Sequence, residues 1–216
     1  QSDGIIQLGE DPSQIPHFVD YMPSVGDRKY IDINNDGVIN EDDTVLLGNA
    51  NPDFSYGFGN TFIYKNWSLN IFMSGVYGNE IANFNKFGLE SFDGLRNNSS
   101  AALDRWTLAN PTNDYPRANA DPRRTNTFSD VQVEDESYLK VRDITLAYNL
   151  NSKTLKKLKL NNMRFYLSAK NSFVLTDYSG YDPEVNRFSE DPLRSGADYG
   201  SYPTTRIFTV GMNVTF

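Results

Sequence analysis

The sequence predicts an all-β protein built from about five long antiparallel strands, and three observations indicate this fold class. Five segments alternate apolar and polar residues with a period of two, which is the pattern of a strand with one apolar face. Each segment is ten to thirteen residues long, and short and long connections alternate between them. The segments are residues 54–65, 66–77, 138–150, 163–175 and 206–216.

The first four segments each gather apolar and aromatic side chains on one face and small polar or charged side chains on the other. In chain order the apolar faces hold Phe54, Tyr56, Phe58, Phe62 and Tyr64; Trp67, Leu69, Ile71, Met73 and Tyr77; Ile144, Leu146, Tyr148 and Leu150; and Met163, Phe165, Leu167, Ala169, Phe173 and Leu175, with Asn171 interrupting the last set.

The final segment alternates without a break from Phe208 to Phe216. Its apolar face holds Phe208, Val210, Met212, Val214 and Phe216, and its polar face holds Thr209, Gly211, Asn213 and Thr215.

Strand length and connection length favour a membrane barrel over a soluble fold. A tilted strand needs about 9–11 residues to cross a bilayer, and aromatic residues near strand ends are typical of outer-membrane barrels. The connection at Lys65–Asn66 is very short and that at 151–162 is compact and basic, with a helical turn capped by Ser152 or Thr154, whereas 78–137 and 176–205 are long. Short turns on one side and long loops on the other are a barrel feature. The alternation alone also fits a soluble β-sandwich with an apolar core.

Composition excludes several classes of function. A net charge of −8 and a pI near 4.7 argue against a nucleic-acid partner, which requires a basic surface. The chain has no cysteine and a single histidine, His17, so disulfides, thiol nucleophiles and most histidine-based catalytic or zinc sites are excluded. No apolar run approaches the ~20 residues of a membrane helix.

Residues 32–43 match the ligand spacing of an EF-hand calcium loop. The loop turns sharply at Gly37, and position eight is the apolar Ile39. Position twelve is Asp43, where an EF-hand loop usually has glutamate. Dockerin loops also carry aspartate at this position. Because aspartate is one methylene shorter than glutamate, bidentate binding of the ion is less certain. The expected calcium ligands are Asp32, Asn34, Asp36, Asp43 and the backbone carbonyl of Val38.

Several loop motifs together resemble the SusC/RagA-type TonB-linked outer-membrane proteins. The chain order and spacing of these motifs are more specific than any one of them. The motifs are Ser2–Gln7, Arg105–Thr107 followed by Asn110–Pro111 and Tyr115–Arg117, Ser137–Leu146, Gly180–Glu184, and Tyr202–Pro203 with Arg206 and the terminal Phe216.

The resemblance implies a 22-stranded transmembrane antiparallel β-barrel with long extracellular loops, of which this chain is the C-terminal part. Residues 1–52 would form an extracellular segment that carries the calcium loop, and residues 53–216 would form barrel strands and loops. The plug domain and the contact with TonB would lie in an N-terminal region that these residues do not include. Such a Bacteroidetes-type importer takes up oligosaccharides or peptides under a SusD-like surface lipoprotein, in the outer membrane of a Gram-negative bacterium.

Other polar clusters offer weaker alternatives, and no enzyme is expected. Glu134–Glu136 could bind a cation or form a solvated face, and Asp182, Glu184, Glu190 and Asp191 could supply a glycosidase pair only within a cleft. The runner-up function is a soluble, calcium-stabilised β-sandwich that binds carbohydrate. Four loop tyrosines could stack on sugars, contact the lipoprotein or pack within their loop: Tyr178, Tyr181, Tyr199 and Tyr202.

Overall fold

The structure is a computed structural model that describes residues 1–94, 96–121, 127–185 and 195–216. The chain forms two compact units, which we call the sheet unit and the loop unit. The sheet unit comprises Ala50–Glu80, Asp135–Asn186 and Ser201–Phe216, and the loop unit comprises Gln1–Asn49, Ile81–Glu134 and Arg187–Gly200.

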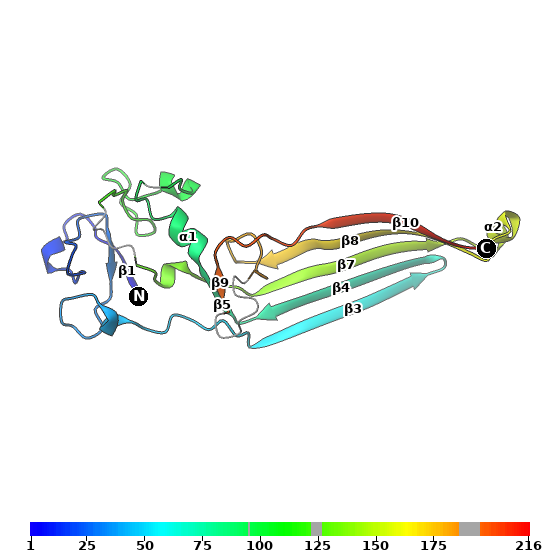
Figure 1. Cartoon of the computed structure of the whole chain (residues 1–216), viewed down its shortest axis with the longest axis horizontal. Helices are drawn as coiled ribbons and strands as arrows, with labels where there is room; N and C mark the ends of the chain where they lie inside the picture. The colour runs from blue at the N-terminus through cyan, green and yellow to red at the C-terminus, as the bar shows by residue number, and fades with distance from the viewer. Residues whose placement is uncertain (95, 122–126, 186–194) are drawn as a thin grey trace. The chain divides into compact units, whose positions relative to one another are not determined.

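The sheet unit contains one antiparallel sheet of five long strands (Figure 1). The order across the sheet is β10-β8-β7-β4-β3, so these five strands lie side by side in chain order, with long connections between β4 and β7 and between β8 and β10. The predicted five strands are confirmed, with ends that differ by a few residues. The strands are β3 (Phe54–Tyr64), β4 (Trp67–Tyr77), β7 (Tyr138–Asn149), β8 (Asn162–Thr176) and β10 (Ile207–Thr215).

The apolar face of this sheet is open. Phe208 is 72 % exposed and Val210 is 83 % exposed, whereas a sandwich would bury both between two sheets. The alternative of a soluble β-sandwich is therefore wrong. Aromatic residues collect where β3 and β4 meet: Tyr64 pairs with Trp67, and the ring centroids of Trp67 and Tyr148 lie 4.8 Å apart.

A β-bulge shifts the alternation of β7 by one residue. Met73 pairs with Val141 and the adjacent Phe72 pairs with Asp143, so Arg142 is the extra residue on β7. Because paired residues share a face, Val141 lies on the apolar face with Met73. Its residue number is odd, whereas the apolar residues after the bulge, Ile144, Leu146 and Tyr148, have even numbers. On β8 the irregularity falls at Asn171, whose φ of 50° explains why it interrupts the apolar pattern.

On the polar face two aromatic rings lie across glycines of neighbouring strands. The ring of Phe72 comes within 3.7 and 3.8 Å of the positions that a Cβ would take at Gly59 and Gly57. The ring of Tyr166 occupies the space that a Cβ at Gly211 would need. The position of the Tyr166 ring therefore requires glycine at 211, whereas a Cβ at Gly57 or Gly59 would make ordinary van der Waals contact with the Phe72 ring.

Two connections join strands at one end of the sheet, which we call the turn end. Lys65 and Asn66 link β3 to β4, and the helix α2 (Ser152–Leu158) links β7 to β8 (Figure 1). The sequence predicted Ser152 or Thr154 as the N-cap of α2, and this prediction is wrong. The N-cap is Asn151, whose side-chain oxygen accepts a hydrogen bond from the backbone N–H of Thr154 at 2.9 Å. The helix ends at Lys159, which has a left-handed φ of 55°.

The loop unit contains short elements that the sequence pattern did not predict. Its most buried apolar residues are Ile5, Ile6, Ile81 and Phe92. None of the helices in the described residues is long and apolar enough to cross a membrane. The elements are β1 (Ser2–Ile5) paired with β2 (Arg28–Tyr30), a sheet of order β6-β5-β9 (Val133–Asp135, Glu80–Asn83, Ala197–Asp198), α1 (Phe84–Leu89) and the 3₁₀ turns η1 (Pro12–Gln14), η2 (Glu41–Asp43), η3 (Ser100–Leu103) and η4 (Asp130–Gln132).

Gly75 permits the close approach of β4 to β7 beside the bulge. A Cβ there would overlap the carbonyl oxygen of Tyr138 and lie 2.6 Å from the Tyr56 hydroxyl. We expect Gly75→Ala to lower the unfolding free energy of the receptor that contains this chain by about 1–3 kcal/mol, the usual cost of overpacking. The matched control is Gly59→Ala, where the nearest atom lies at 3.7 Å. Urea unfolding followed by heat-modified gel mobility measures both, and equal stability of the two variants would contradict the prediction.

Candidate functional site

The calcium-like loop folds around Asp32. Its carboxylate accepts hydrogen bonds from the backbone N–H groups of Asn35 at 2.7 Å and Gly37 at 2.8 Å. Gly37 has a φ of 86°, a left-handed value that favours glycine and explains its place at the predicted turn. The first and sixth positions of the loop are therefore tied together.

The remaining predicted ligands make similar contacts within the loop. The amide oxygen of Asn34 accepts from the N–H of Asp36 at 3.0 Å, and the Asp36 carboxylate accepts from the N–H of Val38 at 2.8 Å. Asp43 is buried and accepts from the N–H groups of Asn40 at 2.9 Å and Ile33 at 2.8 Å. These backbone donors, with that of Asn40 first, hold the pKa of the Asp43 carboxyl below its ordinary value.

The donor chemistry of this loop suits a hard cation, but its acidic side chains do not converge in the structure. A carboxylate offers about four lone-pair positions, so one that accepts one or two N–H groups keeps capacity for a metal. Among the described residues, however, no group of three or more His, Cys, Asp or Glu side chains is placed to hold a metal ion. Calcium at Asp32, Asn34, Asp36, Val38 and Asp43 stays a prediction.

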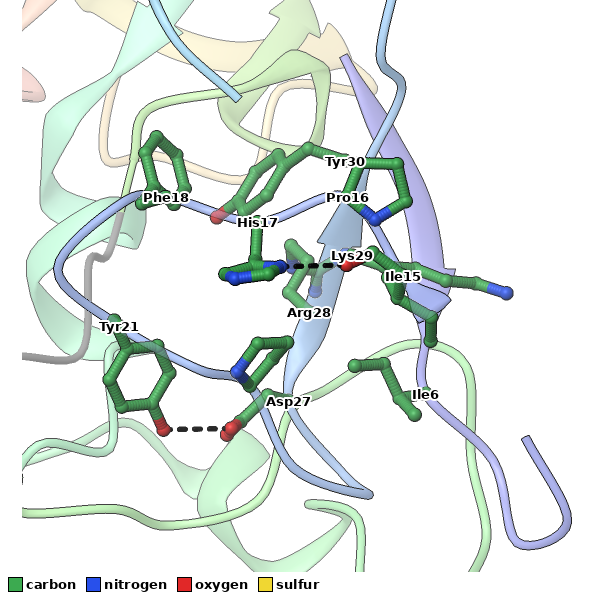
Figure 2. Close-up of a pocket in the computed structure, with 11 residues that line it drawn as sticks. Ile6, Ile15, Pro16, His17, Phe18, Tyr21, Asp27, Arg28, Lys29 and Tyr30 are labelled. Atoms are coloured by element: carbon green, nitrogen blue, oxygen red, sulfur yellow. Dashed lines mark hydrogen bonds between the residues drawn. The ribbon is translucent and has the colours of Figure 1, made fainter. Parts of the chain in front are cut away.

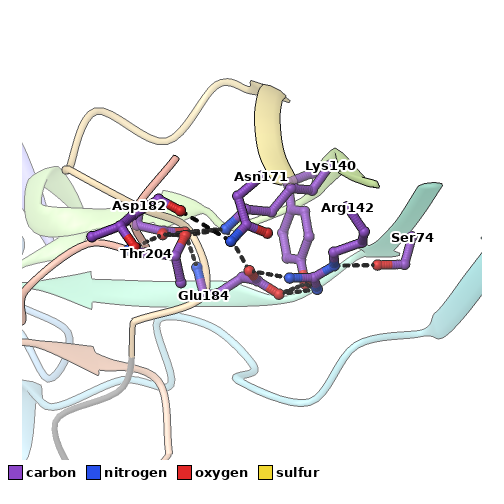
Figure 3. Close-up of polar contacts among 9 residues, drawn as sticks. Ser74, Lys140, Arg142, Asn171, Asp182, Glu184 and Thr204 are labelled. Carbon is purple, nitrogen blue, oxygen red and sulfur yellow. Dashed lines mark hydrogen bonds and ion pairs between the residues drawn. The ribbon is translucent and has the colours of Figure 1, made fainter. Parts of the chain in front are cut away.

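A second polar cluster lies in the sheet unit, and the sequence analysis did not identify it. Lys140 on β7 is only 3 % exposed, and its ammonium donates to Asp182 at 3.2 Å, to Glu184 at 2.6 Å and to the Thr204 hydroxyl at 2.5 Å (Figure 3). Asp182 is itself 5 % exposed. Buried charges are tolerated only when paired, and here a lysine is paired with two carboxylates.

Arg142, the bulge residue, completes this cluster. Its guanidinium donates to both carboxylate oxygens of Glu184 and to the Ser74 hydroxyl at 2.7 Å, and Tyr138 donates to Glu184 at 2.7 Å. The positive charges of Lys140 and Arg142 thus balance the negative charges of Asp182 and Glu184. We call the cluster the loop clamp; it consists of Tyr138, Lys140, Arg142, Asp182, Glu184 and Thr204.

The loop clamp keeps its carboxylates ionised. Burial raises the pKa of the Asp182 carboxyl, but hydrogen bonds from Thr204 and from the backbone of Glu184 outweigh it, so that pKa lies below its ordinary value. Burial also raises the pKa of the Glu184 carboxyl. Hydrogen bonds from Arg142, Lys140 and Tyr138 outweigh this effect and hold that pKa below its ordinary value. Because folding lowers both pKa values, the clamp stabilises the fold above the ordinary carboxyl range and loses this contribution as the pH falls through the lowered values.

The loop clamp binds two parts of the long connection 176–205 to β7. Asp182 and Glu184 are held in ion pairs with Lys140 and Arg142, which leaves neither carboxylate available as the acid or the nucleophile of a glycosidase pair. Glu190 and Asp191, the other two residues of that hypothesis, lie outside the described residues. The acidic run is also used in structural contacts: Glu134 pairs with Lys86 at 3.1 Å, and Glu136 accepts from Asn79 at 2.5 Å.

The four loop tyrosines do not form one cluster. Tyr178 is buried, and Tyr199 stacks on Phe84 with ring centroids 4.2 Å apart. Tyr181 and Tyr202 project, being 78 % and 85 % exposed. Packing within the protein therefore accounts for the first two, Tyr199 against α1 of the other long connection, and the last two are exposed and available to a ligand or a partner.

In the loop unit the motif residues serve to hold the fold. Arg117 donates to Asp27 at 2.9 Å, and the ring of Trp106 fills the space above Gly26. A cavity of about 20 Å³ lies beside His17 and Asp27 (Figure 2). That volume suits about one water molecule, so it offers no ligand site. His17 contacts the carbonyl of Ile15 at 2.9 Å through Nδ1, in keeping with a structural role in its loop.

We expect Lys140→Met to release the connection 176–205. Removing the ammonium takes the ion pair with Lys140 away from the buried Asp182 carboxylate and leaves Glu184 with Arg142 alone, and breaking a buried ion pair typically costs about 3–5 kcal/mol. Lys170→Met is the matched control, because Lys170 is an exposed lysine on β8 of the same sheet. Limited proteolysis of the receptor should cut within 176–205 in the Lys140 variant alone; equal protection in both variants would show that the clamp does not hold the loop.

Comparison with known proteins identifies relatives by sequence. No protein-family model matches the chain. The chain is similar to TonB-dependent receptor P3 of Formosa agariphila, with 36 % identity over 196 residues that cover 88 % of this chain and 19 % of that receptor. TonB-dependent receptor SusC of Bacteroides thetaiotaomicron is 25 % identical over 199 residues, covering 88 % of this chain and 18 % of SusC. The chain spans about one fifth of the length of these relatives.

Solved structures show the same fold. The RagAB peptide importer in its open-open state matches 100 % of this chain and 22 % of its own, with a TM-score of 0.75 and 22 % identity. A second structure of the RagAB peptide transporter gives a TM-score of 0.74. By name these relatives are receptors and a peptide importer. The strand pattern, the loop motifs and the comparisons agree: the chain belongs to the SusC/RagA-type TonB-dependent receptors of the outer membrane and forms a segment of their β-barrel.

Proposed function

We propose that this chain forms part of the wall and the outer rim of an importer that takes up oligosaccharides or peptides across the outer membrane. The observation that carries the proposal is the similarity to TonB-dependent receptors over 88 % of the chain, at 36 % identity. The sheet supports it, because one face is apolar and open towards lipid and the other is polar, as a water-filled passage requires.

The proposal includes two partners that lie outside this chain. TonB would supply energy through another region of the receptor, since the chain covers only about one fifth of its relatives. A SusD-like surface lipoprotein would cover the loop side, by analogy with SusC and the RagAB importer. The projecting Tyr181 and Tyr202 are the residues that we assign to ligand contact, since exposed aromatic rings stack on sugar rings and pack on apolar peptide side chains.

The test uses the full-length receptor purified with its lipoprotein, and it compares binding of oligosaccharide and oligopeptide pools. We expect the double variant Tyr181→Ala/Tyr202→Ala to weaken binding of the bound class about tenfold, the loss of one to two aromatic contacts. Tyr64→Ala is the matched control, an exposed tyrosine at the turn end. Retention of neither pool by the intact complex would overturn the importer proposal, and an unchanged affinity would remove the two tyrosines from the site.

We also propose that residues 32–43 bind calcium through Asp32, Asn34, Asp36, the Val38 carbonyl and Asp43. The oxygen donors, their spacing and the sharp turn at Gly37 support this site. Binding requires the carboxylates to approach one another more closely than they do here. The ion would then supply electrostatic cross-linking of the loop and no chemistry.

Calorimetry on the intact receptor tests the calcium site. We expect Asp36→Ala to weaken calcium binding at least tenfold, because it removes a charged ligand. Asp42→Ala is the matched control: it deletes one exposed carboxylate from the same loop at a position outside the ligand set. No calcium uptake by the parent receptor, or an equal loss in both variants, would count against this ligand set.

A further inference from the structure

We propose that the turn end of the sheet binds anionic phospholipid headgroups of the leaflet that surrounds it. The binding surface is a set of lysines that we call the basic rim. Its members are Lys65, in the turn between β3 and β4, and Lys153, Lys156, Lys157 and Lys159, in and directly after α2.

The charge of the chain is segregated along the sequence in a way that isolates the basic rim. The chain as a whole carries a net charge of −8. The segments 54–79, 144–176 and 199–216 nevertheless contain no Asp or Glu at all, and they hold eight Lys and Arg residues. Five of these eight form the basic rim. A cationic end on an acidic protein needs a reason other than overall composition.

Within the part of the chain that the structure describes, no carboxylate side chain neutralises the basic rim. The side chains of α2 that carry charge are exposed, and among the described residues none of the five lysines forms an ion pair with an Asp or Glu side chain. Four positive charges fall within seven residues of α2 and its C-cap, where they repel one another. An external anion would relieve this repulsion.

The rim borders the face that meets lipid. Tyr64 and Trp67 lie on the apolar face at the turn end, and the ammonium of Lys65 sits 5.2 Å from the centroid of the Tyr64 ring. This cation–π contact places the Lys65 charge beside an exposed belt aromatic. Aromatic belts of barrels sit at headgroup level, so the basic rim reaches the depth of lipid phosphates.

The apolar face of the sheet adjoins this charge. From Tyr64 and Trp67 it continues through the paired Phe62 and Leu69, and Leu69 pairs in turn with Leu146 on β7. A lipid with its phosphate at Lys65 lays the start of its acyl chains along these side chains. The surface therefore presents both halves of a phospholipid site, a cation and an adjoining apolar face.

The occupant that fits is a glycerophospholipid with net negative charge, such as phosphatidylglycerol. Short barrel turns face the periplasm, so the basic rim meets the inner leaflet of the outer membrane. A basic residue near an anionic membrane surface contributes about 1 kcal/mol, or about fivefold in affinity. Several exposed lysines together can thus enrich anionic lipid over zwitterionic lipid.

The experiment measures lipid preference directly in the full-length receptor. A Leu158→Cys substitution on the exposed side of α2 takes a fluorophore, in a background without other reactive cysteines. The labelled receptor is placed in phosphatidylcholine vesicles, and quenching by brominated phosphatidylglycerol is compared with quenching by brominated phosphatidylcholine. We expect about a fivefold preference for phosphatidylglycerol, which falls below about twofold in Lys156→Gln/Lys157→Gln. Glutamine keeps the helix propensity of lysine.

The matched control is Lys170→Gln/Arg206→Gln, which removes two cations from the same sheet unit away from the basic rim and should keep the preference. Equal quenching by the two lipids in the parent protein, or a preference that survives the α2 variant, would overturn the proposal. A preference abolished by millimolar inorganic phosphate would also overturn it in favour of a soluble-anion site. The readout is independent of uptake, so failure here leaves the importer proposal intact.

Discussion

Complete backbone pairing in a solvent without water is the constraint on which this sheet depends. In hydrocarbon an unpaired N–H or C=O costs several kcal/mol, so strands must run the full depth of the membrane with partners on both sides. The five strands meet this demand among themselves over nine to fifteen residues each. The outer edges of β3 and β10 have no partner strand in this chain's sheet, and the remaining strands of a closed barrel satisfy them.

Within that framework the bulge at Arg142 connects membrane wall and loop. Next to the bulge, Val141 lies on the apolar face with Met73. Lys140 and Arg142 reach the polar side, where they contact Asp182 and Glu184 of the connection 176–205. Arg142 is the extra residue of the bulge and has no partner on β4, and its guanidinium contacts both Ser74 and Glu184. The irregularity thus anchors a loop without exposing charge to lipid.

The sequence predicts the strands well because period two is a direct consequence of what each face meets. Phe208, Val210 and Met212 alternate with Thr209, Gly211 and Asn213, so a slip of one residue would turn every apolar side chain to the polar face. Asn171 marks a true irregularity of β8, but nothing in the alternation shows its left-handed backbone. The loop clamp could not be foreseen, since Lys140 and Asp182 are 42 residues apart and only burial distinguishes them from solvated charges. The calcium loop is predicted from spacing, whereas convergence of its ligands is a property of side-chain geometry, which spacing does not determine. The Asn151 cap and the short strands of the loop unit depend on local contacts too brief to give a periodic signal.

The ring of Tyr166 occupies the space over Gly211 of the neighbouring strand that a Cβ would need. A side chain at position 211 would push the phenol away from the sheet and further out from the polar face. In the proposed importer the polar face borders the passage. Glycine at this position therefore adds to the free cross-section of that proposed passage, because one aromatic ring fills room that a second side chain would otherwise take.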